Sequence, residues 1–222
     1  MPGVSCRRVS LFLFAFLLFQ PALSGATSDD DLFFKSVADV NDGDLVFLAK
    51  VPDRPIHHHL NRIRIDDASL ETGWVHLEQC HTHLDAVPSS QVLYREGFVR
   101  SLRVSRADGI GRAWVEGPSV QLENVGPEAR LCVQADTRAL SDRDGNSYFL
   151  RNGPYMRRFL DGYYPMRVSL AVQLDTSKLR FVGITPPPQT GLTVNSNAHG
   201  VEVEALFEGQ LRTEMRFDLK HP

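Results

Sequence analysis

Apolar and polar residues alternate along most of the chain from residue 44 onward. A period of two places successive side chains on opposite faces of a β-strand, so this pattern predicts strands. Gly, Pro, Asn and Asp residues, which favour turns, separate the alternating segments. The predicted strands are 44–51, 61–65, 74–84, 91–96, 98–106, 111–117, 129–140, 147–151, 166–174, 178–184, 200–209 and 210–219.

This succession of short strands predicts an all-β fold, an antiparallel sandwich of immunoglobulin-like type or a related barrel. A parallel α/β fold would need repeated helical crossovers, and the pattern contains none. One short helix is predicted at 151–165, where Asn152 suits an N-cap, Pro154 the first turn and Gly162 the stop. Residues 27–222 are predicted to form a single domain, with 140–147 as an alternative internal boundary.

The first 26 residues have the pattern of a secretory signal peptide. Arg7 and Arg8 precede an apolar run at 9–19, and small residues follow up to Ala26. A membrane-spanning helix needs about 20 apolar residues, so this run is too short to be one. We therefore expect cleavage after Ala26, or alternatively after Ser24, and a periplasmic or extracellular mature protein without a membrane span.

The charge balance argues against nucleic acid as a partner. The chain has 24 Lys and Arg against 27 Asp and Glu residues, and removal of Arg7 and Arg8 leaves 22 basic residues and a net charge near −5. No basic block or basic-aromatic stripe interrupts this balance. A metal ion or a protein of the cell envelope is the expected partner.

Two of the three cysteines, Cys80 and Cys132, lie beyond the predicted signal peptide. An even pair in an oxidising compartment predicts a disulfide. The alternative is a thiolate that binds a soft metal such as copper.

Motifs for nucleophilic catalysis or phosphate binding are weak. No G-x-S-x-G motif occurs, and the Gly109–Gly111 pair is predicted to form a turn because it lacks a strand–helix context. The segment 142–147 ("DRDGNS") lacks the Gly and Glu positions of a calcium loop and is predicted to form a hairpin turn. These absences lower the expectation of an enzyme without excluding one.

Six of the eight histidines fall between residues 54 and 88. Three of them directly precede the predicted strand 61–65 and extend its alternation, and three lie on the predicted strand 74–84, with a polar connection at 66–73 between the two strands. Antiparallel pairing of apolar with apolar and amide with amide residues places four histidines on one face of a hairpin. Arg62 then lies opposite Glu78 on the other face, an opposite-charge pair that favours this register. The predicted pairs are Ile65–Val75, Ile63–Leu77, Asn61–Gln79, His59–His81 and His57–His83.

Imidazole groups in this arrangement predict a transition-metal site, with copper or zinc as the candidate ions. The predicted ligands are His57, His59, His81, His83 and Asp85, whereas Asn61 and Gln79 are placed to orient the rings. The alternative is a His-rich end of a sheet that binds no metal.

A second candidate site combines aromatic rings and guanidinium groups within residues 154–167. Such groups stack on sugars or bind an anion. The alternative is structural, with the rings anchoring a short helix and the arginines in surface ion pairs. The candidate residues are Tyr155, Arg157, Arg158, Tyr163, Tyr164 and Arg167.

Together these features predict an exported envelope protein that binds a transition metal without catalysis, as a carrier, a sensor or an assembly accessory. One alternative is a metal-free interaction module that uses residues 154–167. The other is a metal-dependent hydrolase or oxidase with three His ligands and an open position for water.

Overall fold

The computed structural model describes residues 43–159 and 161–220. The predicted signal peptide and the start of the predicted domain at residue 27 lie outside this part of the chain. Among the described residues, no helix has the length and apolar character needed to cross a membrane.

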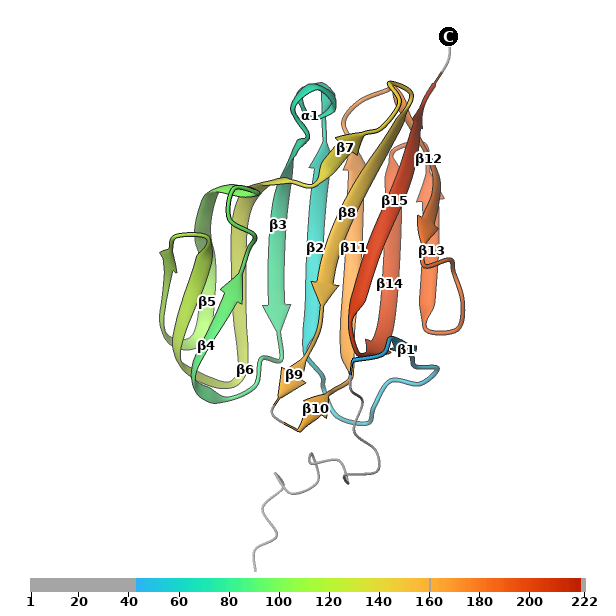
Figure 1. Ribbon diagram of the computed structural model, residues 1–222. Helices are drawn as coiled ribbons and strands as arrows, with labels where there is room; N and C mark the ends of the chain where they lie inside the picture. Colours follow the sequence, from blue (N-terminus) through green and yellow to red (C-terminus); the bar gives the residue numbers. More distant parts are fainter. Residues whose placement is uncertain (1–42, 160, 221–222) are drawn as a thin grey trace, which may run out of the picture. The chain divides into compact units, whose positions relative to one another are not determined.

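The described part is nearly all β, which confirms the predicted fold class (Figure 1). Its elements are β1 (Val46–Phe47), β2 (His58–Ile65), α1 (Asp67–Thr72), β3 (Trp74–Thr82), β4 (Val87–Leu93), β5 (Val99–Glu116), β6 (Ser119–Arg138), β7 (Leu140–Asp142), β8 (Ser147–Tyr155), β9 (Arg158–Phe159), β10 (Gly162–Tyr163), β11 (Met166–Leu174), β12 (Leu179–Thr185), β13 (Leu192–Asn197), β14 (Gly200–Glu208) and β15 (Leu211–Leu219).

The largest sheet has the strand order β1-β14-β11-β2-β3-β6-β4, with β13 beside β14 and β5 beside β6. Its pairs are antiparallel except for β2 and β11, which run parallel, so this sheet is mixed and not purely antiparallel as predicted. Parallel neighbours need a long connection, and here the chain builds β3 to β10 between them. A four-stranded sheet (β12-β15-β8-β7) and the β9–β10 pair complete the described strands, which form no closed barrel.

The four-stranded sheet packs over the large sheet, with the main hydrophobic core between them (Figure 1). Alternate residues of both sheets point inward, as expected for strands with one buried face. The large sheet contributes Ile63, Leu77, Met166, Leu170 and Phe207, and the small sheet contributes Leu150, Leu179, Leu211, Met215 and Phe217. Burial of this apolar surface is the main stabilising term of the fold.

A second core lies under β4, β5 and β6. The first part of β6 pairs with both β4 and β5, and its last part pairs with β3 and β5. Buried residues of β6 such as Leu122 and Leu131 form this core. Tyr94, directly after β4, packs against both cores and so borders the space between them.

The predicted helix at 151–165 is wrong, because its residues form the end of β8 and the strands β9 and β10. Gly153 has a positive φ of 94°, which a helix does not allow. Tyr155 is buried against the large sheet, and this tertiary contact outweighs the local helix signals.

The helix lies instead in the β2–β3 connection, as α1. Its N-cap is Asp66, whose side chain accepts a hydrogen bond from the Ser69 backbone N–H at 2.8 Å. The Ser69 side chain binds back to the Asp66 backbone N–H, which completes a capping box. Gly73 ends the helix with φ +77°, and a Cβ there would lie 2.7 Å from the Leu140 carbonyl oxygen.

Two predicted turns have different outcomes. The Gly109–Gly111 pair is not a turn but lies within β5, where the pairing shifts between Asp108 and Ile110 as a β-bulge. The turn predicted at 142–147 is confirmed between β7 and β8. The Asp142 Oδ1 atom accepts backbone N–H groups of Asp144 and Gly145, at 3.0 and 2.7 Å.

Candidate functional site

The β2–β3 hairpin has the register predicted from the residue pattern. Asn61 lies opposite Gln79, and His59 lies opposite His81. The other face of the hairpin pairs Arg62 with Glu78. Since side chains alternate along a strand, the inner face carries both the amides and the two histidines into the space between the sheets.

Three of the four predicted histidines come together at the end of this hairpin. His57, just before β2, places its Nε2 atom 3.0 Å from the Nδ1 atom of His81. The ring centroid of His59 is 4.2 Å from that of His81. His59 and His81 are only 8% and 4% exposed. The cluster is therefore a buried group of stacked imidazoles and not a solvated sheet end.

The other two predicted metal ligands, His83 and Asp85, have partners outside the three stacked imidazoles. β3 ends at Thr82, and His83 has φ +53° and lies 2.7 Å from Glu128 at the exposed surface. Asp85 forms an ion pair with Arg157 at 2.5 Å. Across the described residues, no set of three or more His, Cys, Asp or Glu side chains is arranged to hold a metal ion.

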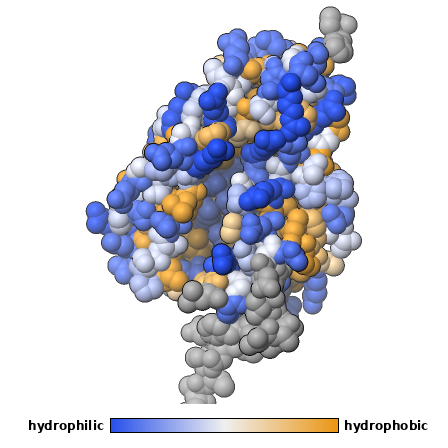
Figure 2. Space-filling view, viewed as in Figure 1, coloured by the Kyte–Doolittle hydropathy of each residue, from blue (hydrophilic) through white to orange (hydrophobic). Residues whose placement is uncertain are grey.

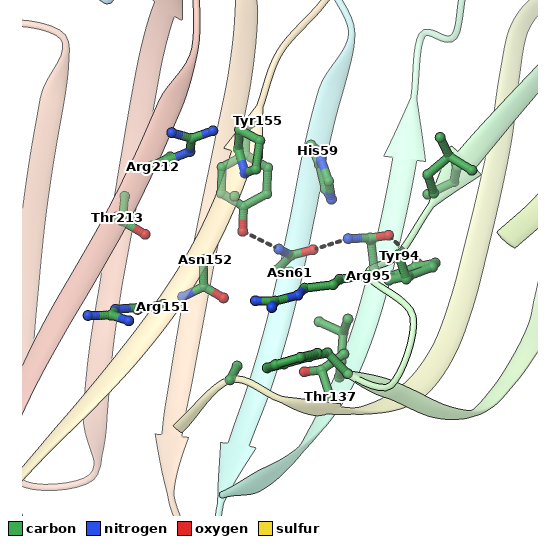
Figure 3. A pocket seen from close by; sticks show the side chains of 18 of the residues that line it. His59, Asn61, Tyr94, Arg95, Thr137, Arg151, Asn152, Tyr155, Arg212 and Thr213 are labelled. Carbon is green, nitrogen blue, oxygen red and sulfur yellow. Dashed lines mark hydrogen bonds between the residues drawn. The ribbon is translucent and has the colours of Figure 1, made fainter. Parts of the chain in front are cut away.

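A chain of hydrogen bonds holds the inner face in place (Figure 3). The Gln79 Nε2 atom donates to Asn61 Oδ1 at 3.1 Å, and Asn61 Nδ2 donates to the Tyr155 hydroxyl at 2.6 Å. Gln79 Oε1 accepts a bond from the Tyr94 hydroxyl and lies 3.3 Å from His81 Nε2. Because Oε1 only accepts, His81 donates from Nε2, and its Nδ1 lone pair faces His57.

Burial keeps these histidines neutral. Desolvation lowers the pKa of His57 to about 4 and that of His59 to about 3. The pKa of His81 is also well below its usual value, first through burial and then through the neighbouring imidazoles. Burial raises the pKa values of Tyr94 and Tyr155. At neutral pH these three histidines and two tyrosines therefore carry no charge.

These side chains line a cleft of about 1430 Å³ between the sheets, and Figure 2 shows the hollow on this face of the molecule. Sites for drug-sized ligands are usually ~300–1000 Å³, so the cleft has room for an extended ligand. The large sheet contributes the histidines and amides, the segment after β4 contributes Tyr94 and Arg95, and β8 and β15 contribute Asn152 and Thr213 (Figure 3).

Three buried polar atoms in the described part of the chain have no hydrogen-bond partner, and all belong to residues that line this cleft. They are His59 Nε2, Asn152 Nδ2 and Thr213 Oγ1. Asn152 and Thr213 lie opposite each other in the β8–β15 ladder. Buried polar atoms in native proteins are bonded to protein or to ordered water in about 90% of cases or more, so these three atoms mark where water or a ligand would complete the hydrogen bonding of the cleft.

The candidate residues of the second predicted site, within 154–167, lie partly in the cleft and partly elsewhere. Tyr155, Arg157 and Arg158 line the cleft, so half of this candidate set lies in the same cavity as the histidines. The other three residues are not among the lining residues. They are Tyr163, whose hydroxyl accepts a bond from Gln210, Tyr164, which packs edge-on against Phe159, and Arg167, which pairs with Glu204.

Sequence reasoning missed Tyr94, Arg95, Asn152 and Thr213 as site residues. Asn152 and Thr213 carry a signal, since each is a polar residue at an inward position of an otherwise apolar alternation. Nothing comparable marks Tyr94 and Arg95, which lie in a connection.

Cys80 and Cys132 lie directly opposite each other on β3 and β6 and form the predicted disulfide, with an S–S distance of 2.09 Å. The alternative role of these cysteines as thiolate ligands is therefore wrong. The alternation along β3 places Cys80 on the sheet face opposite to His81.

Comparison with known proteins gave no match to a family model, to a curated protein or to a solved structure.

Proposed function

We propose that this protein is an exported, non-catalytic binding module that holds a polar organic ligand in the cleft between its two sheets. The observation that carries this proposal is the convergence of three unpartnered buried polar atoms on one cavity. The residue pattern at 1–26 and the Cys80–Cys132 disulfide support export, because disulfides persist in oxidising compartments.

The electrostatics favour binding over acid–base catalysis. A general base works best when its pKa is near the operating pH. The pKa values of His57 and His59 are lowered to about 4 and about 3, far from neutrality. Hydrogen bonds hold the side chains of Gln79, Asn61 and Tyr155 in fixed orientations on one wall of the cleft. Such preorganisation lowers the entropic cost of binding a ligand.

The test is a ligand panel with two matched variants. Wild-type protein is screened by thermal shift and calorimetry against carboxylates, amino acids, short peptides and saccharides. Asn152→Leu removes one unpartnered donor of the cleft and should weaken binding at least tenfold, about 1.4 kcal/mol. Asn195→Leu, at an exposed position of β13, is the control and should bind as the wild type does. Equal ligand affinity in Asn152→Leu and the wild type would refute the cleft as the site.

A transition metal at the histidines is the second candidate, with copper or zinc as the ion. Its support is that His57 Nε2 and His81 Nδ1 face each other at 3.0 Å, and that the His59 ring, with its unpartnered Nε2, has its centroid 4.2 Å from that of His81. Gln79 Oε1 accepts from His81 Nε2, as the outer partner of a ligating histidine does. It ranks second because the described residues contain no set of three metal-binding side chains in suitable positions.

Calorimetric titration with Cu(II) and Zn(II) tests the metal directly. If a metal binds, His59→Ala and His81→Ala should each weaken binding at least tenfold, because these imidazoles lie deepest. His58→Ala is the control, since His58 lies on the opposite face and contacts Ser169 Oγ at 2.7 Å. Circular dichroism checks that each variant is folded. Indistinguishable titrations of the three variants would remove the metal candidate.

A further inference from the structure

We infer that the ligand of the cleft is an acidic oligosaccharide, whose hydroxyls bind the unpartnered polar atoms and whose carboxylate binds Arg95. This inference rests on the proposed function of the cleft and names the ligand class. Four features of the cavity support it: the hydrogen-bonding groups, the aromatic lining, the charge and the size.

The unpartnered atoms suit hydroxyl groups. Asn152 Nδ2 is a donor, the Thr213 hydroxyl both donates and accepts, and His59 Nε2 donates or accepts according to the tautomer of the neutral ring. A sugar hydroxyl also donates and accepts, so it matches each of these groups without introducing a charge. Thr213 is only 2% exposed, so a ligand group that fails to bind its hydroxyl would leave a buried polar atom unsatisfied.

The atoms also lie on both walls of the cleft. His59 belongs to β2 of the large sheet, whereas Asn152 and Thr213 belong to β8 and β15 of the small sheet. A ligand that satisfies all three must therefore carry several polar groups at different positions. A saccharide chain has this distribution of hydroxyls around each ring.

Aromatic side chains line the same cavity. They are Tyr94, Phe98, Tyr148, Tyr155 and Phe159. These rings present flat apolar faces, and the tyrosines add a hydroxyl at the edge, which suits sugar rings with one apolar face and a polar edge.

The charged residues of the lining favour an acidic ligand. The lining contains six arginines and four carboxylates, and two of these carboxylates, Asp85 and Glu214, already pair with Arg157 and Arg151. Arg95 forms no ion pair with any described residue and lies 3.9 Å above the Phe98 ring. Figure 3 shows its guanidinium extending across the cleft on the side of Asn152. The planar guanidinium fork matches a carboxylate better than an ammonium does.

The volume of about 1430 Å³ exceeds the needs of a single sugar and suits a chain of several residues. The probes are therefore a set of uronate tetrasaccharides (galacturonate, glucuronate and mannuronate types), the methyl esters of the same sugars and a tetrapeptide of glutamate. The ester keeps every hydroxyl but loses the charge, so it isolates the carboxylate contact.

Calorimetry with the full mature chain should show at least one uronate tetrasaccharide binding tenfold more tightly than its ester. Arg95→Gln should erase this difference by weakening the uronate alone, whereas Asn152→Leu and Thr213→Val should weaken both sugars. Arg103→Gln is the charge control, because Arg103 lies on exposed β5 and outside the lining residues. Thr193→Val, at an exposed position of β13, is the control for Thr213→Val. Raised salt should weaken the uronate more than the ester.

The outcomes separate the ligand class from the site. Equal binding of acid and ester, tighter binding of the glutamate peptide, or no saccharide binding by the wild type overturns the acidic oligosaccharide. In these cases the cleft proposal stands if any ligand of the wider panel still depends on Asn152. Binding that is unchanged in both Asn152→Leu and Thr213→Val overturns the site and the ligand class together.

Discussion

A fall from pH 7 to pH 5 should destabilise the folded protein by roughly 2 kcal/mol through His59, and further through His81. Both side chains are buried and have lowered pKa values, with desolvation as the largest cause. The unfolded chain binds protons as the pH falls below its ordinary histidine pKa of about 6.5, whereas the folded protein does not until much lower pH. Stability is therefore fully present above this value and is lost as the pH decreases toward about 3.

Urea unfolding at pH 7, 6 and 5 measures this effect. His59→Gln should make the loss between pH 7 and pH 5 smaller by roughly 2 kcal/mol, because this buried imidazole is absent. His199→Gln, at an exposed turn, controls for the general loss of a histidine. A free energy of unfolding that stays constant from pH 7 to pH 5 would contradict neutral burial of the pair.

Removal of the disulfide in the Cys80→Ser/Cys132→Ser variant should lower the free energy of unfolding by about 4 kcal/mol. The bond closes a loop with a sequence separation of 52 residues, and its loss gives the unfolded chain more conformational entropy. The two strands are already paired in the sheet, so we expect the variant to keep the native fold at neutral pH.

Denaturant titrations with and without reductant provide the measurement. Reductant should destabilise the wild type to the level of the double variant and leave the double variant unchanged. A difference below about 1 kcal/mol would show that the unfolded chain is constrained by other means.

The β2–β3 hairpin was predictable because the residues that determine its faces and register are close together in the sequence. Period-two alternation assigns each residue of β2 and β3 to a face, and the Arg62–Glu78 pair selects the register that the structure has. Alternation and register alone place His59 opposite His81, whatever the rest of the fold is. The same reasoning fails for His83, because the strand ends at Thr82 and the backbone turns at a positive φ.

The opposite wall of the cleft was not predictable in this way. Asn152 resembles a helix N-cap in its local sequence, but its place is fixed by pairing with Thr213, 61 residues further along the chain. Local signals at Pro154 and Gly162 favoured a helix, but the pairing of β8 with β15 and the burial of Tyr155 against Asn61 override them. The positions of Asn152 and Thr213 in the cleft lining are therefore set by long-range contacts.

The parallel pairing of β2 with β11 has a consequence for the order of folding. β2 meets β3 within one short connection, but its other neighbour begins at Met166, and the register joins His58 to Arg167. Contacts between residues so distant in sequence form slowly, because a long loop must close first. The local hairpin can form early with its imidazoles in water, where they bind protons at mildly acidic pH. Acid should therefore slow the last stage of folding, in which β11 and the small sheet enclose the histidines.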